Sequence, residues 1–123
     1  MLDEYIKLFS GYDGDFGIAD MSKAKLDSER NKLKPDYEWA GRPITPVDYK
    51  NHIDGKISIG IQPCKLDKTA QFACIDIDPK NYSQFNIKNY LTKFEQYKLP
   101  LIPLLSKSGG LHCYVFLKEP IPA

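Results

Sequence analysis

The sequence predicts an α+β fold in which helices flank a mainly antiparallel sheet. Two observations carry this prediction. Residues 56–123 follow the order strand, strand, helix, strand, strand, and a short amphipathic helix comes before them. Nine prolines and eight glycines in 123 residues also favour short strands and loops over long helices. We expect a single domain over residues 1–123, with a helix and loop region at 1–55 and the core at 56–123.

The N-terminal region gives the weaker signal. Apolar side chains at steps of three and four predict a helix over residues 1–10, which Gly11 ends. Residues 11–50 show no clear hydrophobic period. We predict loop there, together with a marginal helix around residues 23–32, where a charged stretch carries a thin apolar face.

Two strands are predicted at the start of the core. Residues 56–62 alternate, with isoleucine at every second position, and a proline ends the pattern. Residues 72–78 form the second strand, which a proline also ends. Because side chains alternate along a strand, Asp76 and Asp78 share one face while apolar residues take the other.

A helix and two further strands complete the predicted core. Residues 83–98 place aromatic and aliphatic side chains at steps of three and four, with charged side chains mostly opposite, which predicts a helix. Residues 101–105 are a short buried strand. A polar, glycine-rich turn at residues 106–110 joins it to a last strand at residues 111–118.

Charge and cysteine content exclude several classes of protein. Seventeen Lys and Arg residues against sixteen Asp and Glu residues give a net charge of +1, which excludes a globally basic coat for nucleic acid. No apolar run approaches the roughly 18 residues of a membrane helix, and the N-terminus lacks a secretory pattern. Three widely spaced cysteines fit neither a disulfide framework nor a zinc ribbon. We therefore expect a soluble, cytoplasmic protein with no membrane partner.

The two aspartates of residues 72–78 are the first candidate for chemistry. Asp76 and Asp78 lie two residues apart, so their side chains leave the strand roughly 6–7 Å from each other. Like charges at this spacing repel, and a divalent cation such as Mg²⁺ or Mn²⁺ relieves the repulsion by binding to carboxylate and phosphate oxygens. The alternative is that the strand ends early and both acids cap a turn at Pro79.

The second candidate is the turn Ser106-Lys-Ser-Gly-Gly110 with His112 just behind it. Glycines allow backbone N–H groups to turn toward an anion, and the Ser106 and Ser108 hydroxyls and the Lys107 ammonium add donors. A histidine at the start of the next strand can donate to a phosphate oxygen. The alternative is an ordinary hairpin turn with an incidental histidine. Taken together, the aspartates and the turn predict a site for a metal and a nucleoside triphosphate.

These residues also carry a resemblance to a known family. Phe72-Ala-Cys-Ile-Asp76-Ile-Asp78 resembles the first catalytic motif of the archaeo-eukaryotic primase superfamily, and Ser106-Lys-Ser-Gly-Gly-Leu-His112 resembles the second. The likeness covers about residues 40–120 and is greatest to the primase domain of TOTE conflict systems and to CRISPR-associated primase-polymerases. It implies a partial RRM-like primase-polymerase core.

The resemblance also implies roles for individual residues. Asp76 and Asp78 would bind the catalytic Mg²⁺ or Mn²⁺, and His112 with Ser106, Ser108 and the glycines Gly109 and Gly110 would contact the triphosphate. Lys107 is added on its charge and position. The implied enzyme is a nucleotidyltransferase, a DNA primase or polymerase of replication or repair. Its partners would be nucleoside triphosphates, a DNA template and primer, and associated helicase, nuclease or CRISPR proteins.

One departure from the family pattern limits the expected activity. A third acidic motif on a later strand completes the metal site of the family, and no acidic residue follows Glu119, which lies too close to His112 to replace it. We expect the N-terminal part of a catalytic module that is inactive by itself. The alternatives are a non-catalytic module that binds nucleotide or nucleic acid, and a sugar-nucleotide transferase that uses D-x-D on a diphosphate.

Overall fold

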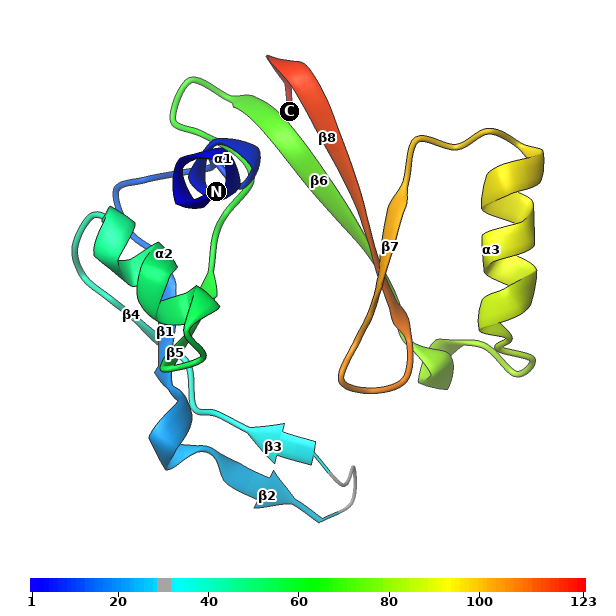
Figure 1. The fold of residues 1–123 in the computed structure, drawn as a ribbon, viewed down its shortest axis with the longest axis horizontal. Helices are drawn as coiled ribbons and strands as arrows, with labels where there is room; N and C mark the ends of the chain where they lie inside the picture. The colour runs from blue at the N-terminus through cyan, green and yellow to red at the C-terminus, as the bar shows by residue number, and fades with distance from the viewer. Residues whose placement is uncertain (29–31) are drawn as a thin grey trace. The chain divides into compact units, whose positions relative to one another are not determined.

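The computed structural model describes residues 1–28 and 32–123 and has an α+β fold (Figure 1). It divides into two compact units. The first unit comprises Met1–Phe72 and Leu117–Ala123, and the second comprises Ala73–Phe116. The elements in chain order are α1 (Leu2–Leu8), β1 (Gly17–Asp20), η1 (Met21–Lys23), β2 (Lys25–Asp27), β3 (Lys32–Lys34), β4 (Glu38–Trp39), α2 (Pro46–Ile53), β5 (Ile57–Gly60), β6 (Thr69–Ile77), η2 (Pro79–Asn81), α3 (Ile87–Gln96), β7 (Ile102–Leu105) and β8 (Leu111–Pro122).

The first unit is built on a small antiparallel sheet of strand order β4-β1-β5. Strand β1 pairs along its whole length with β5, from Gly17 opposite Gly60 to Asp20 opposite Ile57. Helices α1 and α2 pack together, and the ring of Tyr5 in α1 meets the buried ring of Tyr49 in α2 edge to face. Strands β2 and β3 form a separate two-stranded ribbon.

Helix α2 begins in a dense set of polar contacts. Thr45 and Asp48 form a capping box, and Pro46 supplies the first turn, where its missing N–H costs nothing. The Arg42 guanidinium donates two hydrogen bonds to the buried Asp48 carboxylate, at 2.7 and 2.8 Å, and lies over the ring of Phe16. These contacts fix the start of α2 on the sheet of the first unit.

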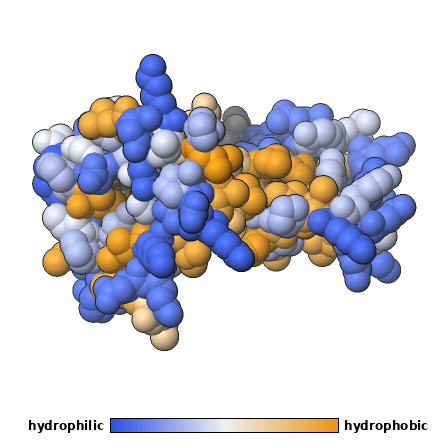
Figure 2. Space-filling model, turned by 90° about the horizontal axis from the view of Figure 1, so that it is seen from above, coloured by the Kyte–Doolittle hydropathy of each residue, from blue (hydrophilic) through white to orange (hydrophobic). Residues whose placement is uncertain are grey.

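The second unit holds helix α3, strand β7, the second half of β6 and the first half of β8, and these strands form a sheet of order β6-β8-β7. Its core consists of Ile77, Leu111 and Cys113, which are buried. Partly buried side chains from α3 and its flanking segments pack against this core, namely Phe85, Ile87, Tyr90, Phe94 and Leu101. The right end of the surface in Figure 2, where α3 lies, is mostly hydrophilic. Helix α3 is therefore amphipathic, with its aromatic side toward the sheet.

Most of the predicted elements are confirmed, with shifted ends. The helix of residues 1–10 is α1, and the helix of residues 83–98 is the shorter α3. The strands of residues 56–62, 72–78, 101–105 and 111–118 are β5, β6, β7 and β8. The expected burial of residues 101–105 is wrong, because Ile102, Leu104 and Leu105 are at least half exposed. The predicted α+β class with antiparallel pairing is also confirmed. The single domain divided after residue 55 stays a prediction.

Residues 11–50 are the part that the sequence misjudged. The marginal helix around residues 23–32 is wrong, because its described part forms η1, β2 and the start of β3. Strands β1 and β4 and helix α2 were expected to be loop. Strands of two to four residues are too short to show a period of two. Helix α2 buries only Asp48 and Tyr49, so its apolar signal is weak.

None of the helices in the described ranges is long and apolar enough to cross a membrane.

Candidate active site

Asp76 and His112 lie side by side on neighbouring strands of the second unit. Asp76 is on β6 and His112 is on β8, and these strands are adjacent in the sheet. The Oδ1 atom of Asp76 is 3.6 Å from the Nε2 atom of His112. The side chains are 66% and 43% exposed, so both are accessible to a ligand. The pairing of β6 with β8 thus brings together residues from the two predicted motifs.

Asp78 lies just beyond the end of β6. The strand ends at Ile77 rather than at Asp78 as predicted, and Asp78 caps η2 by accepting a hydrogen bond from the Lys80 N–H at 3.1 Å. The capping alternative therefore describes Asp78, while Asp76 remains within the strand. A carboxylate has about four lone-pair sites, so one capping bond leaves Asp78 able to bind a cation.

The turn between β7 and β8 is held by its own hydrogen bonds. The Ser106 hydroxyl accepts from the Gly110 N–H at 3.0 Å, and the Ser106 N–H donates to the Gly110 carbonyl at 2.9 Å. The Gly109 N–H donates to the Ser106 carbonyl at 3.1 Å. Gly109 has φ of 81°, a left-handed conformation that favours glycine. The hydroxyls of Ser106 and Ser108 are 3.0 Å apart, and Lys107 and Ser108 are exposed.

Gly110 places this turn directly against the end of β6. A Cβ atom added to Gly110 would lie 2.1 Å from the Ile77 carbonyl oxygen and 2.9 Å from Cδ of Pro79. Such distances leave no room for any side chain, so only glycine allows the approach. Ile77 stands between the two aspartates, and the close approach therefore fixes the turn beside both of them. From the sequence, Gly110 was expected to help bind an anion. Its packing against Ile77 has no signal in the sequence.

Cys74 lies on the same face of the sheet as Asp76 and His112, which we call the site face. Burial raises the pKa of the Cys74 thiol. A hydrogen bond with the Tyr114 hydroxyl lowers this pKa, and the charge of the Asp76 carboxylate raises it. Cys74 and Asp76 lie two residues apart on β6 and therefore share a face, as do His112 and Tyr114 on β8. The site face therefore carries a carboxylate, an imidazole, a thiol and a phenol.

The residues at this site fit a hard divalent cation that is only partly bound by protein. Among the described residues, no group of three or more His, Cys, Asp and Glu side chains could hold a metal ion. Mg²⁺ commonly takes one or two carboxylates and completes its shell with water and substrate phosphates. The exposed Asp76 and the neighbouring Asp78 supply that number of oxygen ligands. The donor set suits Mg²⁺ or Mn²⁺ and does not suit a structural zinc.

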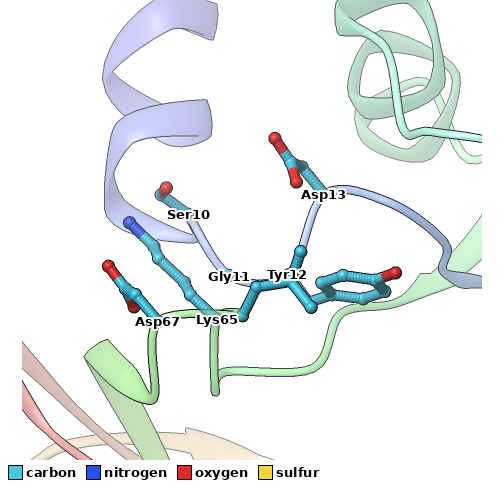
Figure 3. A pocket seen from close by; sticks show the side chains of 7 residues that line it. Ser10, Gly11, Tyr12, Asp13, Lys65 and Asp67 are labelled. Carbon is cyan, nitrogen blue, oxygen red and sulfur yellow. The ribbon is translucent and has the colours of Figure 1, made fainter.

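A surface pocket of the first unit involves none of the predicted site residues (Figure 3). It has a volume of about 280 Å³ and is lined by Ser10, Gly11, Tyr12, Asp13, Lys65, Leu66 and Asp67. The Tyr12 N–H donates to the Gln62 carbonyl at 2.8 Å, and a Cβ on Gly11 would lie 2.1 Å from the same oxygen. The pocket thus follows from a close contact between two loops.

Comparison with known families agrees with the motifs. A family model described as the archaeo-eukaryotic primase domain of the TOTE conflict system matches residues 17–123. The match includes Asp76, Asp78, the turn of residues 106–110 and His112, and it begins after α1. The resemblance predicted from the two motifs is therefore confirmed. No curated protein matches the sequence.

Proposed function

The chain belongs to the archaeo-eukaryotic primase family of TOTE conflict systems, and on this premise we propose that it binds a divalent metal and a nucleoside triphosphate for template-directed nucleotidyl transfer. The observation that carries the proposal is the contact between Asp76 and His112 at 3.6 Å, beside a turn that Gly110 packs against Ile77. Anionic ligands for a metal and donors for a phosphate thereby meet at one end of one sheet.

Asp76 and Asp78 hold the metal in this proposal. Bound Mg²⁺ or Mn²⁺ would lower the pKa of the attacking hydroxyl and neutralise the leaving pyrophosphate. The two carboxylates would hold the cation beside the turn, because both flank Ile77, the residue that Gly110 touches. Asp76 also positions the imidazole of His112, because its carboxylate Oδ1 lies 3.6 Å from Nε2.

His112 and the turn hold the triphosphate. The His112 imidazole, the Ser108 hydroxyl and the Lys107 ammonium are the proposed contacts for phosphate oxygens, while Ser106, Gly109 and Gly110 shape the turn. A primer 3′-hydroxyl, or the hydroxyl of an initiating nucleotide, forms a bond to the α-phosphorus. The bond from that phosphorus to the bridging oxygen breaks, pyrophosphate leaves, and the hydroxyl proton passes to solvent.

The membership in the family supports further proposals about substrates and partners. The substrates are nucleoside triphosphates and a DNA template with its primer, in replication or repair within the cytoplasm. Helicase, nuclease or CRISPR proteins are the proposed associates. The family pattern includes a third acidic residue that these residues lack, so residues 1–123 alone are proposed to bind nucleotide without polymerising it.

Thermal unfolding tests the metal and nucleotide site. With Mn²⁺ and a nucleoside triphosphate at about 100 times its Kd, we expect Tm to rise by about 5–10 °C. The double variant Asp76→Asn with Asp78→Asn should lose this rise, because it keeps side-chain size and removes both charges. Its Tm without ligand shows whether the variant still folds.

A matched control exists in the first unit. Asp36→Asn with Glu38→Gln removes two exposed carboxylates with the same spacing and should leave the Tm rise unchanged. A rise that persists in the Asp76 and Asp78 double variant, or that the control also abolishes, would contradict the proposed site.

A non-catalytic nucleotide-binding module is the second candidate. The observation in its favour is that the described residues bring no third metal ligand to Asp76 and Asp78. A primer-extension assay on a longer protein that contains this chain and a third acidic ligand distinguishes nucleotidyl transfer from binding alone. Nucleotidyl transfer predicts primer extension with Mn²⁺ that Asp76→Asn abolishes, whereas the binding module predicts a Tm rise and no extension.

A further inference from the structure

The site face of the second unit continues past His112 as an apolar surface. In the antiparallel pair of β7 and β8, Leu104 lies opposite His112 and Ile102 lies opposite Tyr114. Residues directly opposite each other in such a pair point to the same side of the sheet. Leu104 and Ile102 therefore share the face of His112. The intervening pairs, such as Pro103 with Cys113, point to the side on which α3 covers the core.

Two apolar residues on this face, Ile102 and Leu104, are half exposed, while Tyr114 is partly buried. Leu104 is 51% exposed and Ile102 is 52% exposed, on a sheet whose other side buries Leu111 and Cys113. On β8 the ring of Tyr114 lies parallel to that of Phe116, with centroids 5.9 Å apart and planes 8° apart. We call Ile102, Leu104 and Tyr114 the apolar strip. The strip begins beside His112, whose imidazole contacts the triphosphate in the proposed function.

We propose that the apolar strip binds the nucleoside part of the nucleotide whose triphosphate lies at His112. This inference rests on the proposed function and adds the subsite that holds the sugar and the base. Asp76 lies on the β6 side of His112 and Leu104 lies on the β7 side, so metal and apolar contacts flank the imidazole from opposite directions.

The spacing along the strand suits this occupant. Two residues of a strand span about 7 Å, so Tyr114 and Ile102 lie one such step from His112 and Leu104. A triphosphate held at His112 and the adjacent turn leaves its nucleoside over the next pair of side chains. Other apolar occupants are less suited, because the strip borders directly on charged and phosphate-binding groups.

The chemistry of the strip sets the substrate class. Aliphatic and aromatic side chains contact the faces of all bases, and such contacts are tolerant of base identity. The strip is therefore a subsite for nucleoside triphosphates of any base, and base selection is left to the template. Purine nucleotides should bind only a few-fold tighter than pyrimidine nucleotides, because their larger faces cover more of the strip.

Competition binding with and without the nucleoside tests the proposal. In the presence of Mn²⁺, the wild-type chain should bind ATP and CTP about tenfold tighter than inorganic tripolyphosphate, since burying a small apolar area gives a gain of this size. The double variant Ile102→Thr with Leu104→Thr should reduce that ratio to about twofold, with tripolyphosphate affinity unchanged. Threonine keeps the β-branched character that strands favour.

Leu105→Thr is the matched control. Leu105 is 75% exposed, lies on the same strand and pairs with Leu111 on the other side of the sheet. The control should keep the tenfold ratio. A ratio that survives in the double variant, or that falls equally in the control, would overturn the apolar strip. Tripolyphosphate binding that is absent, or that Asp76→Asn with Asp78→Asn leaves unchanged, would instead overturn the proposed function.

Discussion

Gly110 is the residue on which the geometry of the site depends most directly. Its Cα hydrogen faces the Ile77 carbonyl in a space that a Cβ atom would have to share at 2.1 Å. The contact is with backbone, so no side-chain rotation can relieve an overlap. Any larger residue must push the turn of residues 106–110 away from the end of β6, where Ile77 stands between Asp76 and Asp78.

Gly110→Ala should therefore weaken both stability and nucleotide binding. We expect a loss of about 1–3 kcal/mol in the free energy of unfolding, the usual cost of overpacking. The Tm rise with Mn²⁺ and nucleotide should also fall. Urea unfolding and ligand-dependent melting measure the two effects.

Gly60→Ala is the control for this change. A Cβ there would have its nearest neighbour, the Gly17 Cα, at 3.9 Å, which is ordinary contact. Stability and ligand response should stay close to those of the wild type. Equal losses in both variants would mean that glycine flexibility, rather than the contact with Ile77, is what matters.

Asp48 is a buried residue whose charge serves structure rather than the site. It is 5% exposed, and hydrogen bonds from the Arg42 guanidinium, with further ones from Thr45, hold the pKa of its carboxyl well below the usual range. A carboxyl with a depressed pKa in the folded state stabilises the protein above its unfolded pKa of about 3.9. That stability is lost as the pH falls below this value toward the folded pKa.

Asp48→Asn should remove this pH-dependent stability. At pH 7 we expect unfolding to become easier by about 1–3 kcal/mol, since the variant loses charge-assisted hydrogen bonds. The difference from the wild type should shrink as the pH falls below about 4. Urea unfolding at a series of pH values measures it. A difference that stays constant from pH 7 to pH 2.5 would contradict the assignment.

At the scale of elements, α3 shows how an amphipathic pattern positions the site. Its side chains Tyr90 and Phe94 pack on Ile77, Leu111 and Cys113, the inward-facing neighbours of Asp76 and His112. Asn86 caps the helix by accepting from the Asn89 N–H. The helix covers one side of the sheet. This packing fixes the strands whose other side carries Asp76 and His112.

Shortening an α3 side chain that packs on the core should destabilise the whole second unit. Phe94→Ala should lower the free energy of unfolding by about 2 kcal/mol, below the cost for a fully buried phenylalanine because Phe94 is partly exposed. The neighbouring exposed residue gives the comparison, and Lys93→Ala should change stability by less than about 0.5 kcal/mol. Similar losses in both variants would argue against α3 as a packing element.

Helix α2 is indicated better by the capping residues at its start than by the spacing of its apolar residues. Thr45, Pro46 and Asp48 are the residues of a capped helix start, yet the helix is short and half polar. A reading based on apolar spacing therefore passes over it. The cap, with Arg42 bound to Asp48, stabilises a helix that its apolar contacts alone would not.

At the scale of the whole molecule, sheet membership separates strands that are close in the chain. Strands β5 and β6 were expected in one core, but β5 pairs with β1, while β6 joins β8 and β7. Each of these sheets belongs mainly to a different unit. Strand pairing depends on partners that are distant in sequence, and period-two alternation carries no information about which strand the partner is.

The sequence by itself determined the α+β class, the position of α3 and of strands β5 to β8, and the family, because these rest on local periodicity and short motifs. It also placed Asp76 and His112 at strand ends. Only the tertiary structure decided that these two side chains lie 3.6 Å apart, that Gly110 must be glycine, and that Leu104 borders His112. Contacts of this kind arise from strand register and backbone approach, which involve residues far apart in the chain.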